Sequence, residues 1–164
     1  MKILHKMLAG AALVALHATI LAPTAAYAVD ETNVSKGITL SGVGVAAHSY
    51  DVVSFFAGKP TLGVDAHATT YDGATYRFAT AANLAKFKAA PEKYAPAYGG
   101  FCAYGVALGK KLDGDPRYWK IVDGKLNLLL NGDVFETWKK DIAGNNRTAD
   151  QKWSAIRSTA IDKL

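Results

Sequence analysis

The sequence has 164 residues, of which 19 are lysine or arginine, 14 are acidic and one is cysteine. One cysteine excludes an internal disulfide, and scattered lysines without a basic stripe argue against a nucleic-acid partner.

The first 28 residues have the pattern of a secretory signal peptide. Lys2 and Lys6 precede a mostly apolar run over residues 7–22, and the motif Ala-Tyr-Ala at 26–28 suits a signal peptidase. The apolar run is shorter than the roughly 20 residues that a membrane-spanning helix needs. We therefore expect cleavage after Ala28 and a periplasmic or secreted protein of 136 residues with net charge +3 and no stable membrane span.

The exported part divides into a leader and one domain. Residues 29–43 are predicted to be a leader segment, and residues 44–164 the folded domain. Two hairpins are predicted in this domain, because Asp72-Gly73 and Asp123-Gly124 each separate two β-prone runs, and Asp-Gly is a strong signal for a two-residue turn.

Helices are predicted after each hairpin. Thr80 is expected to cap a helix that runs to residue 89, and a single turn follows over residues 91–94. A short helix is expected to open near Phe101 and to run toward Leu108.

Two further helices are predicted near the C-terminus. Asn131 or Asp133 is expected to cap a helix that ends at Gly144, and Thr148 to begin the last one. The order hairpin, helices, hairpin, helices predicts an α+β fold in which a small antiparallel sheet of hairpins packs against several short helices.

Several motifs resemble a known family. They are Tyr50-Asp51, Tyr-Asp-Gly-Ala-Thr-Tyr-Arg-Phe at 71–78, Pro-Glu-Lys-Tyr-Ala-Pro at 91–96, Tyr-Gly-Gly-Phe-Cys-Ala at 98–103 and Trp-Lys-Ile-Val-Asp-Gly-Lys-Leu at 119–126. In this order they resemble the YHS domain family, and more closely its exported bacterial branch, from about Gly44 to Trp153. The resemblance implies a module related to small cysteine-based metal-binding domains, although Ser49-Tyr50-Asp51 stands where metal-binding relatives carry an early cysteine.

Cys102 is the first candidate site residue. Its thiolate would be a soft ligand for copper or zinc, and three roles remain open for it: metal ligand, small buried hydrophobe, or reactive thiol. His48, His67 and Asp51 would complete a four-ligand metal site. Each histidine has the alternative of an ordinary hydrogen bond, and Asp51 that of capping the turn over residues 52–56.

The sequence lacks the motifs of serine hydrolases, phosphate-binding loops and zinc proteases, so we expect a binding protein and not an enzyme. The first hypothesis is handling of a transition metal ion, copper before zinc, with no other cofactor. The second is a module that binds another exported protein or a small ligand in an aromatic groove, with Cys102 in the core. A thiol-dependent enzyme is the third. The core and its rim are expected to contain Tyr71, Tyr76, Phe78, Tyr94, Tyr98, Phe101, Tyr104 and Trp119.

Overall fold

The computed structural model describes residues 31–35 and 44–164. The predicted signal peptide, residues 1–28, lies outside these residues, as does most of the predicted leader. In chain order the elements are η1 (Ala46–Ser49), η2 (Ser54–Ala57), β1 (Val64–Tyr71), β2 (Ala74–Phe78), α1 (Ala81–Ala89), α2 (Pro91–Tyr94), η3 (Ala97–Gly100), α3 (Ala103–Ala107), β3 (Asp115–Val122), β4 (Lys125–Leu129), α4 (Gly132–Lys139), α5 (Ile142–Ile156) and η4 (Ile161–Lys163). Within this described part of the chain, no helix is both long enough and apolar enough to cross a bilayer.

Both predicted hairpins are confirmed, and so is the α+β class. β1 pairs with β2 and β3 with β4, each pair antiparallel and each a sheet of its own. Asp72 and Gly73 have φ of 46° and 74°, and Asp123 and Gly124 have φ of 49° and 73°. Positive φ at both central residues is what a type I′ turn requires, and this turn matches the twist of the strands that it joins.

The helix predicted from Thr80 is also confirmed, because the Thr80 hydroxyl accepts a hydrogen bond from the amide of Asn83 at 3.1 Å. Asn131 caps α4 in the same way, through the amide of Val134 at 2.9 Å.

The predicted boundary between the last two helices is wrong. α4 ends at Lys139, and Gly144 lies in the first turn of α5 instead of closing the helix before it. The reason is Asp141, whose carboxylate accepts a hydrogen bond from the Gly144 amide at 2.8 Å and caps α5. Thr148 therefore lies inside α5 and does not begin it.

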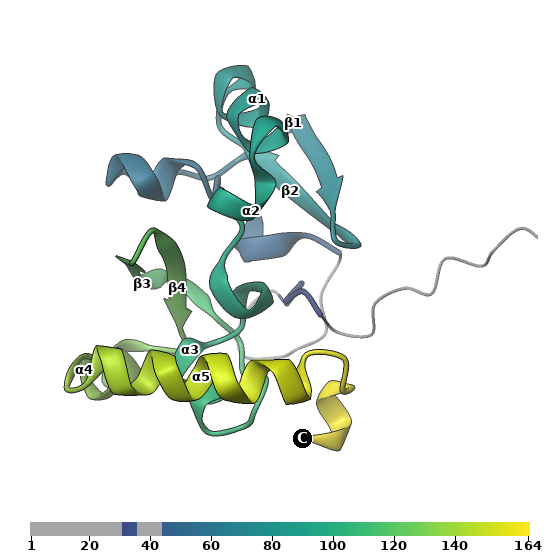
Figure 1. Ribbon diagram of the computed structural model, residues 1–164. Coiled ribbons are helices and arrows are strands. Elements are labelled where there is room, and N and C mark those ends of the chain that lie inside the picture. Colours follow the sequence, from purple (N-terminus) through teal and green to yellow (C-terminus); the bar gives the residue numbers. More distant parts are fainter. Residues whose placement is uncertain (1–30, 36–43) are drawn as a thin grey trace, which may run out of the picture.

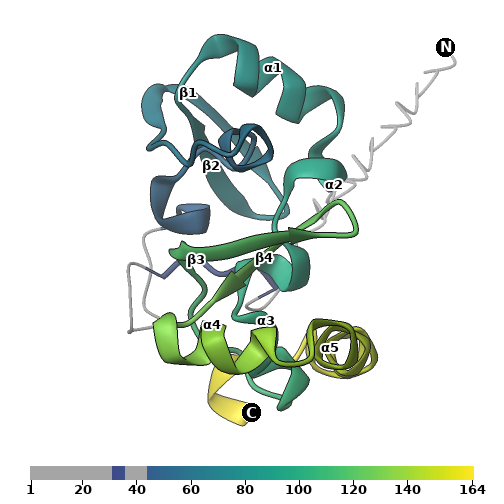
Figure 2. The same ribbon diagram turned by 90° about the vertical axis from the view of Figure 1, so that its left-hand side faces the viewer.

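The domain has two hydrophobic cores, stacked one above the other in Figures 1 and 2, with the β3–β4 hairpin between them. The first lies among η1, η2, the β1–β2 hairpin and α1, and the second among η3 and helices α3 to α5. β4 serves both cores, since Leu126 and Leu128 belong to the first and Leu129 to the second. Alternate residues of a strand face opposite sides, so one strand can join two cores.

Residues 31–35 form an N-terminal strap across the junction of the two cores. The amide of Asn33 donates to the carbonyl of Gly99 at 2.8 Å, and the Thr32 hydroxyl donates to the carbonyl of Asp72 at 3.3 Å. Gly99 has φ of 62°, and a Cβ added to it would lie 1.9 Å from the carbonyl oxygen of Glu31. Only glycine permits this approach, so the position of the strap depends on Gly99.

Lys111 closes the C-terminal end of α5 from inside the second core. Its side chain is 2% exposed, and its Nζ lies 5.5 Å from the centre of the Phe101 ring and 5.7 Å from that of Trp153. Nζ donates to the carbonyls of Arg157 and Thr159, both at 2.7 Å. A cation at this end of a helix satisfies free carbonyls and complements the helix dipole.

Candidate functional site

Asp113 is the centre of a buried polar network that joins the strap to η1. Its Oδ1 accepts hydrogen bonds from Nδ2 of Asn33 at 2.8 Å, from Nε2 of His48 at 2.9 Å and from the Ser35 hydroxyl. Burial raises the pKa of Asp113, but the hydrogen bonds from His48, Ser35 and Asn33 outweigh it and hold the pKa below the usual range. The network therefore needs the ionised carboxylate.

The backbone that presents His48 is strained. Ala47, His48 and Ser49 have φ of 48°, 48° and 68°, three consecutive left-handed residues without a glycine. Each such residue costs about 1–2 kcal/mol relative to the right-handed form. The bond from His48 to the buried carboxylate helps to offset this cost.

Cys102 lies in the second core and is 0% exposed. It caps α3, and its Sγ accepts a hydrogen bond from the Gly105 amide at 3.4 Å. Burial raises the pKa of the thiol, and the backbone hydrogen bonds that favour the thiolate do not compensate. Of its three open roles, this environment supports the small buried hydrophobe.

Asp51 is fully buried and has four donors on its two carboxylate oxygens. Oδ1 accepts from the amides of Val53 at 2.9 Å and Ser54 at 3.3 Å, and Oδ2 from the amide of Ala79 at 2.9 Å and Nδ2 of Asn83 at 2.7 Å. Four hydrogen bonds use the acceptor sites of a carboxylate. The capping role that was the alternative for Asp51 is the one seen here.

The four proposed metal ligands do not form a preformed site. His48 binds Asp113, while His67 lies half-buried on β1 and its imidazole has no hydrogen bond or ion pair with any described residue. Over residues 31–35 and 44–164, no three His, Cys, Asp or Glu side chains are grouped so that they could hold a metal ion.

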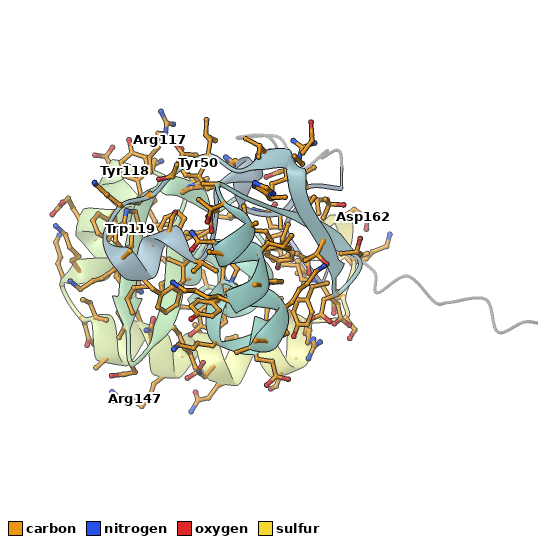
Figure 3. The ribbon with its side chains drawn as sticks, turned by 90° about the horizontal axis from the view of Figure 1, so that it is seen from above. Tyr50, Arg117, Tyr118, Trp119, Arg147 and Asp162 are labelled. Carbon is orange, nitrogen blue, oxygen red and sulfur yellow. The ribbon has the colours of Figure 1, made fainter. Side chains whose placement is uncertain are left out.

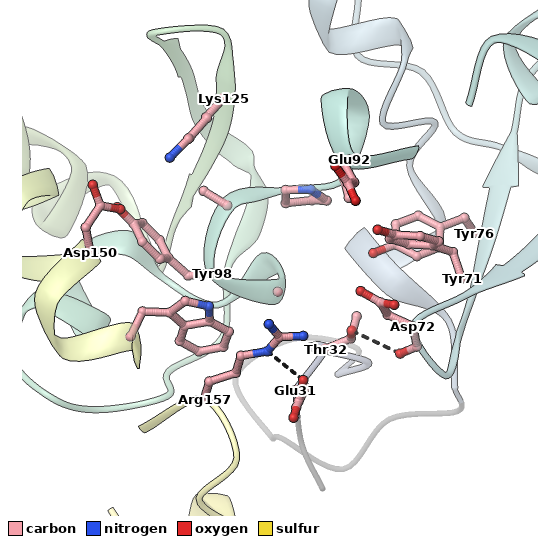
Figure 4. A pocket seen from close by; sticks show the side chains of 15 residues that line it. Glu31, Thr32, Tyr71, Asp72, Tyr76, Glu92, Tyr98, Lys125, Asp150 and Arg157 are labelled. Carbon is pink, nitrogen blue, oxygen red and sulfur yellow. Dashed lines mark hydrogen bonds and ion pairs between the residues drawn. The ribbon is translucent and has the colours of Figure 1, made fainter. Parts of the chain in front are cut away.

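A cavity of about 300 Å³ lies where the two cores meet (Figure 4). Its walls come from five parts of the chain: the strap, the β1–β2 hairpin, residues 92–99, the start of β4 and the C-terminal half of α5. It is lined by Glu31, Thr32, Tyr71, Asp72, Tyr76, Glu92, Ala95, Pro96, Ala97, Tyr98, Gly99, Lys125, Asp150, Trp153 and Arg157.

One wall carries two tyrosines whose hydroxyls point into the cavity (Figure 4). Tyr76 stacks on Phe87 with ring centres 4.8 Å apart, and Tyr71 meets the edge of the same ring at 5.7 Å. Burial raises the pKa of both tyrosines, and the Asp72 carboxylate raises it further. Both hydroxyls are therefore neutral near pH 7, and each can donate and accept a hydrogen bond.

The opposite wall is built from η3 and α5. The Tyr98 hydroxyl donates to Oδ1 of Asp150 at 3.1 Å, and the Tyr98 and Trp153 rings meet edge to face at 6.2 Å. Nearer the strap, Nε of Arg157 pairs with Oε2 of Glu31 at 2.6 Å. This ion pair fixes the strap to the end of α5.

The sequence predicts three of the four aromatic residues of this cavity at the core and its rim, Tyr71, Tyr76 and Tyr98, but it does not predict the cavity. Asp72 has a predicted place only in a turn and a family motif, and Asp150 has none. The aromatic groove of the second hypothesis was the available signal. Its charged residues are far apart in sequence, and no local spacing brings them together.

Residues 52–98 match the family model of the YHS domain. Over these residues the chain is similar to the YHS domain. No curated protein and no solved structure matches the chain at a significant level. The YHS segment supplies Tyr71 and Tyr76 of one wall and Tyr98 of the facing wall, and α5, which lies beyond the segment, supplies the rest of the facing wall. His67 lies within the segment, and Cys102 and His48 lie outside it.

Proposed function

We propose that this protein is an exported binding protein, and not an enzyme, whose ligand occupies the cavity between the YHS segment and α5. The observation that carries the proposal is a cavity at the junction of the two cores where aromatic rings and uncommitted polar groups converge. About 300 Å³ is at the lower end of the volumes found for small-molecule sites. It suits a small molecule or one side chain of a partner.

The cavity is held open by contacts that do not involve a ligand. The Glu31–Arg157 ion pair and the Asn33–Gly99 hydrogen bond hold the strap in place, and the Tyr98–Asp150 bond holds the facing wall. A site that is already ordered loses little conformational entropy when it binds. The polar groups of the walls are thus organised before the ligand arrives.

Two nucleophilic side chains of the described residues, Cys102 and Ser35, support binding over catalysis. Cys102 is sealed in the core with a raised pKa, and Ser35 donates to Asp113 and not to a ring nitrogen of His48. An activated nucleophile needs a base within hydrogen-bond reach and access to a substrate. These facts favour binding over thiol- or serine-dependent chemistry.

Transition-metal binding, copper before zinc, is the second candidate, because the YHS match and the sequence resemblance favour it. Binding through Cys102 would require the second core to open, and Asp51 would have to give up its four donors. The test is a titration of copper(I) and zinc into the protein and its Cys102→Ser variant. We expect equal affinities, and a loss of affinity in the variant would restore Cys102 as a ligand.

Export and ligand binding can be tested on one preparation. The protein is purified in the form in which the cell accumulates it, and its first residue is determined; we expect Val29. Small fragments of positive, negative and zero charge are then added, and backbone amide shifts are recorded.

We expect shifts in Tyr71 to Tyr76 and in Asp150 to Arg157 that are lost in Ala97→Trp, which fills the cavity. Ala143→Trp, an exposed position on α5, is the matched control. Binding that survives Ala97→Trp, or shifts confined to other surfaces, would refute the cavity as the site.

A further inference from the structure

We infer that the cavity recognises a primary ammonium group, through the hydroxyls of Tyr71 and Tyr76 and the carboxylates of Asp72 and Glu92. This inference rests on the proposed function and names the chemical class of its ligand. It follows from three features: the Tyr76 hydroxyl, which opens into the cavity from a buried ring, two carboxylates without an ion pair among the described residues, and an arginine that is already paired with Glu31.

The hydroxyl of Tyr76 is the first observation. The side chain is 3% exposed, lines the cavity and directs its hydroxyl into it (Figure 4). No described residue forms a hydrogen bond with that hydroxyl. The described residues with a fully buried side-chain atom that lacks a partner are Arg77 and Asn127, so the Tyr76 hydroxyl is reached from the cavity while its ring is buried. A group that binds in the cavity would satisfy it.

The second observation is a negative corner beside that hydroxyl. Asp72 and Glu92 line the cavity, and their carboxylates form no ion pair or side-chain hydrogen bond with the described residues. Both carboxylates act on the phenol of Tyr71, and Asp72 acts on that of Tyr76, so the four groups share one region. Both acids are exposed to solvent at the mouth of the cavity, and two carboxylates beside hydroxyl acceptors favour a cation with N–H donors.

The third observation concerns the cations of the cavity. Four acidic and two basic side chains line it, although the domain as a whole is basic. Arg157 is paired with Glu31 at 2.6 Å. Lys125 comes from the start of β4 and lies on the Asp150 side in Figure 4, away from Tyr71 and Tyr76. Asp72 and Glu92 therefore have no ion pair among the described residues, while the Arg157 charge reaches Tyr71 and acts to lower the pKa of its phenol.

A primary ammonium matches this corner better than other cations do. It has three N–H donors, enough for the Tyr76 hydroxyl and two carboxylates at once, whereas a quaternary ammonium has none. The group can come from a small alkylamine or from the lysine side chain of a partner protein. Both sources present the same chemistry to the cavity.

The test is a titration of the purified protein with butylammonium, butanol and butanoate, which share a chain and differ in charge. Amide shifts of Tyr71 to Tyr76 report binding. We expect butylammonium to bind most tightly and tetramethylammonium to bind less well. Comparing 1,4-diaminobutane with Nα-acetyl-lysine amide then distinguishes the sources: tighter diamine binding indicates a small molecule, and tighter lysine binding a protein partner.

Three substitutions test whether the Tyr76 hydroxyl and the carboxylates of Asp72 and Glu92 bind the ammonium group. Tyr76→Phe, Asp72→Asn and Glu92→Gln should each weaken butylammonium binding about threefold to tenfold, the range for a partly exposed charge-assisted hydrogen bond. Tyr76→Phe should leave the urea midpoint unchanged or raise it, since its hydroxyl has no partner to lose. Tyr118→Phe is the control, because Tyr118 does not line the cavity and lies at the rim of the molecule in Figure 3.

The outcomes separate this inference from the proposed function. Butanol or butanoate binding as tightly as butylammonium, or full butylammonium affinity in Tyr76→Phe, overturns the ammonium inference and leaves the cavity as a binding site. The inference is also overturned if fragments bind in the cavity but none of the amines does. If neither fragments nor amines shift the cavity residues, the proposed function fails as well.

Discussion

The substitution Asp113→Asn tests whether the buried network holds the strap and the strained η1 turn in place. It removes the negative charge at Asp113, which is 3% exposed, with almost no change in volume. The three hydrogen bonds to Oδ1 would then end on a neutral acceptor. The substitution therefore probes charge and not packing.

The expected loss of stability follows from those three bonds. A hydrogen bond to a charged group contributes about 1.5–3 kcal/mol, and one between neutral groups about 0.5–1.5 kcal/mol. The charged bonds are therefore stronger by about 1 kcal/mol each, and weakening all three should lower the free energy of unfolding by roughly 3 kcal/mol. This is a large fraction of the 5–15 kcal/mol that typically stabilises a domain. A part of the effect should appear as release of the strap, because Asn33 and Ser35 are two of the three donors.

The pH dependence has a definite sign. The folded pKa of Asp113 lies below that of the unfolded chain, so its ionised form contributes stability above the unfolded pKa of about 3.9. That contribution is lost as the pH falls from there through the folded pKa. Asp113→Asn should therefore be less stable than the parent at pH 7, with a difference that shrinks in acid.

The assay is urea unfolding at pH 7 and at several values below pH 4, with hydrogen exchange of the Asn33 amide as a local probe. Asp162→Asn is the matched control, since this side chain is 73% exposed and lies at the rim in Figure 3. A loss at pH 7 no larger than that of the control would refute the reasoning. A difference that grows in acid would refute it too.

Three further results are expected. Cys102 should react slowly with a thiol reagent in the folded protein, because its side chain is buried and its pKa is raised, and at the rate of a free thiol in urea. A fast reaction without urea would disprove that Cys102 is inaccessible in the folded protein. Lys111→Met should lower the free energy of unfolding by about 2–4 kcal/mol, since it leaves two carbonyls without their donor, whereas Lys110→Met at an exposed neighbour should change it little. Gly99→Ala should lower the free energy of unfolding by at least about 1–2 kcal/mol, because its Cβ would collide with the carbonyl of Glu31. The strap should then be cleaved more readily by a protease, and an unchanged cleavage pattern would contradict this.

Local sequence chemistry was sufficient for the hairpins and for most helix starts. Asp72-Gly73 and Asp123-Gly124 determine their turns because few other residue pairs adopt positive φ twice in succession. Thr80 begins α1 for a similarly local reason, since its partner amide is three residues away. The start of α5 at Asp141 is equally local, since Asp141 binds an amide three residues away, but the sequence prediction read Gly144 as a helix end and missed it.

The environment of Cys102 could not be predicted from its neighbours in sequence. The sequence leaves Cys102 open as a metal ligand, a small buried hydrophobe or a reactive thiol, whereas the structure buries it in the second core. Signal-peptide cleavage and export stay predictions, as does metal binding by Cys102, His48, His67 and Asp51.

The sequence by itself determined the α+β class, both turns and the presence of motifs that resemble a YHS domain. Only the tertiary structure decided that His48 binds Asp113, 65 residues away, and that residues 31, 76 and 150 line one cavity. Turns and caps depend on atoms within a few residues of one another, and residue type restricts them directly. Cavities and buried networks depend on how two cores settle against each other, and many sequences with the same local pattern would place those side chains elsewhere.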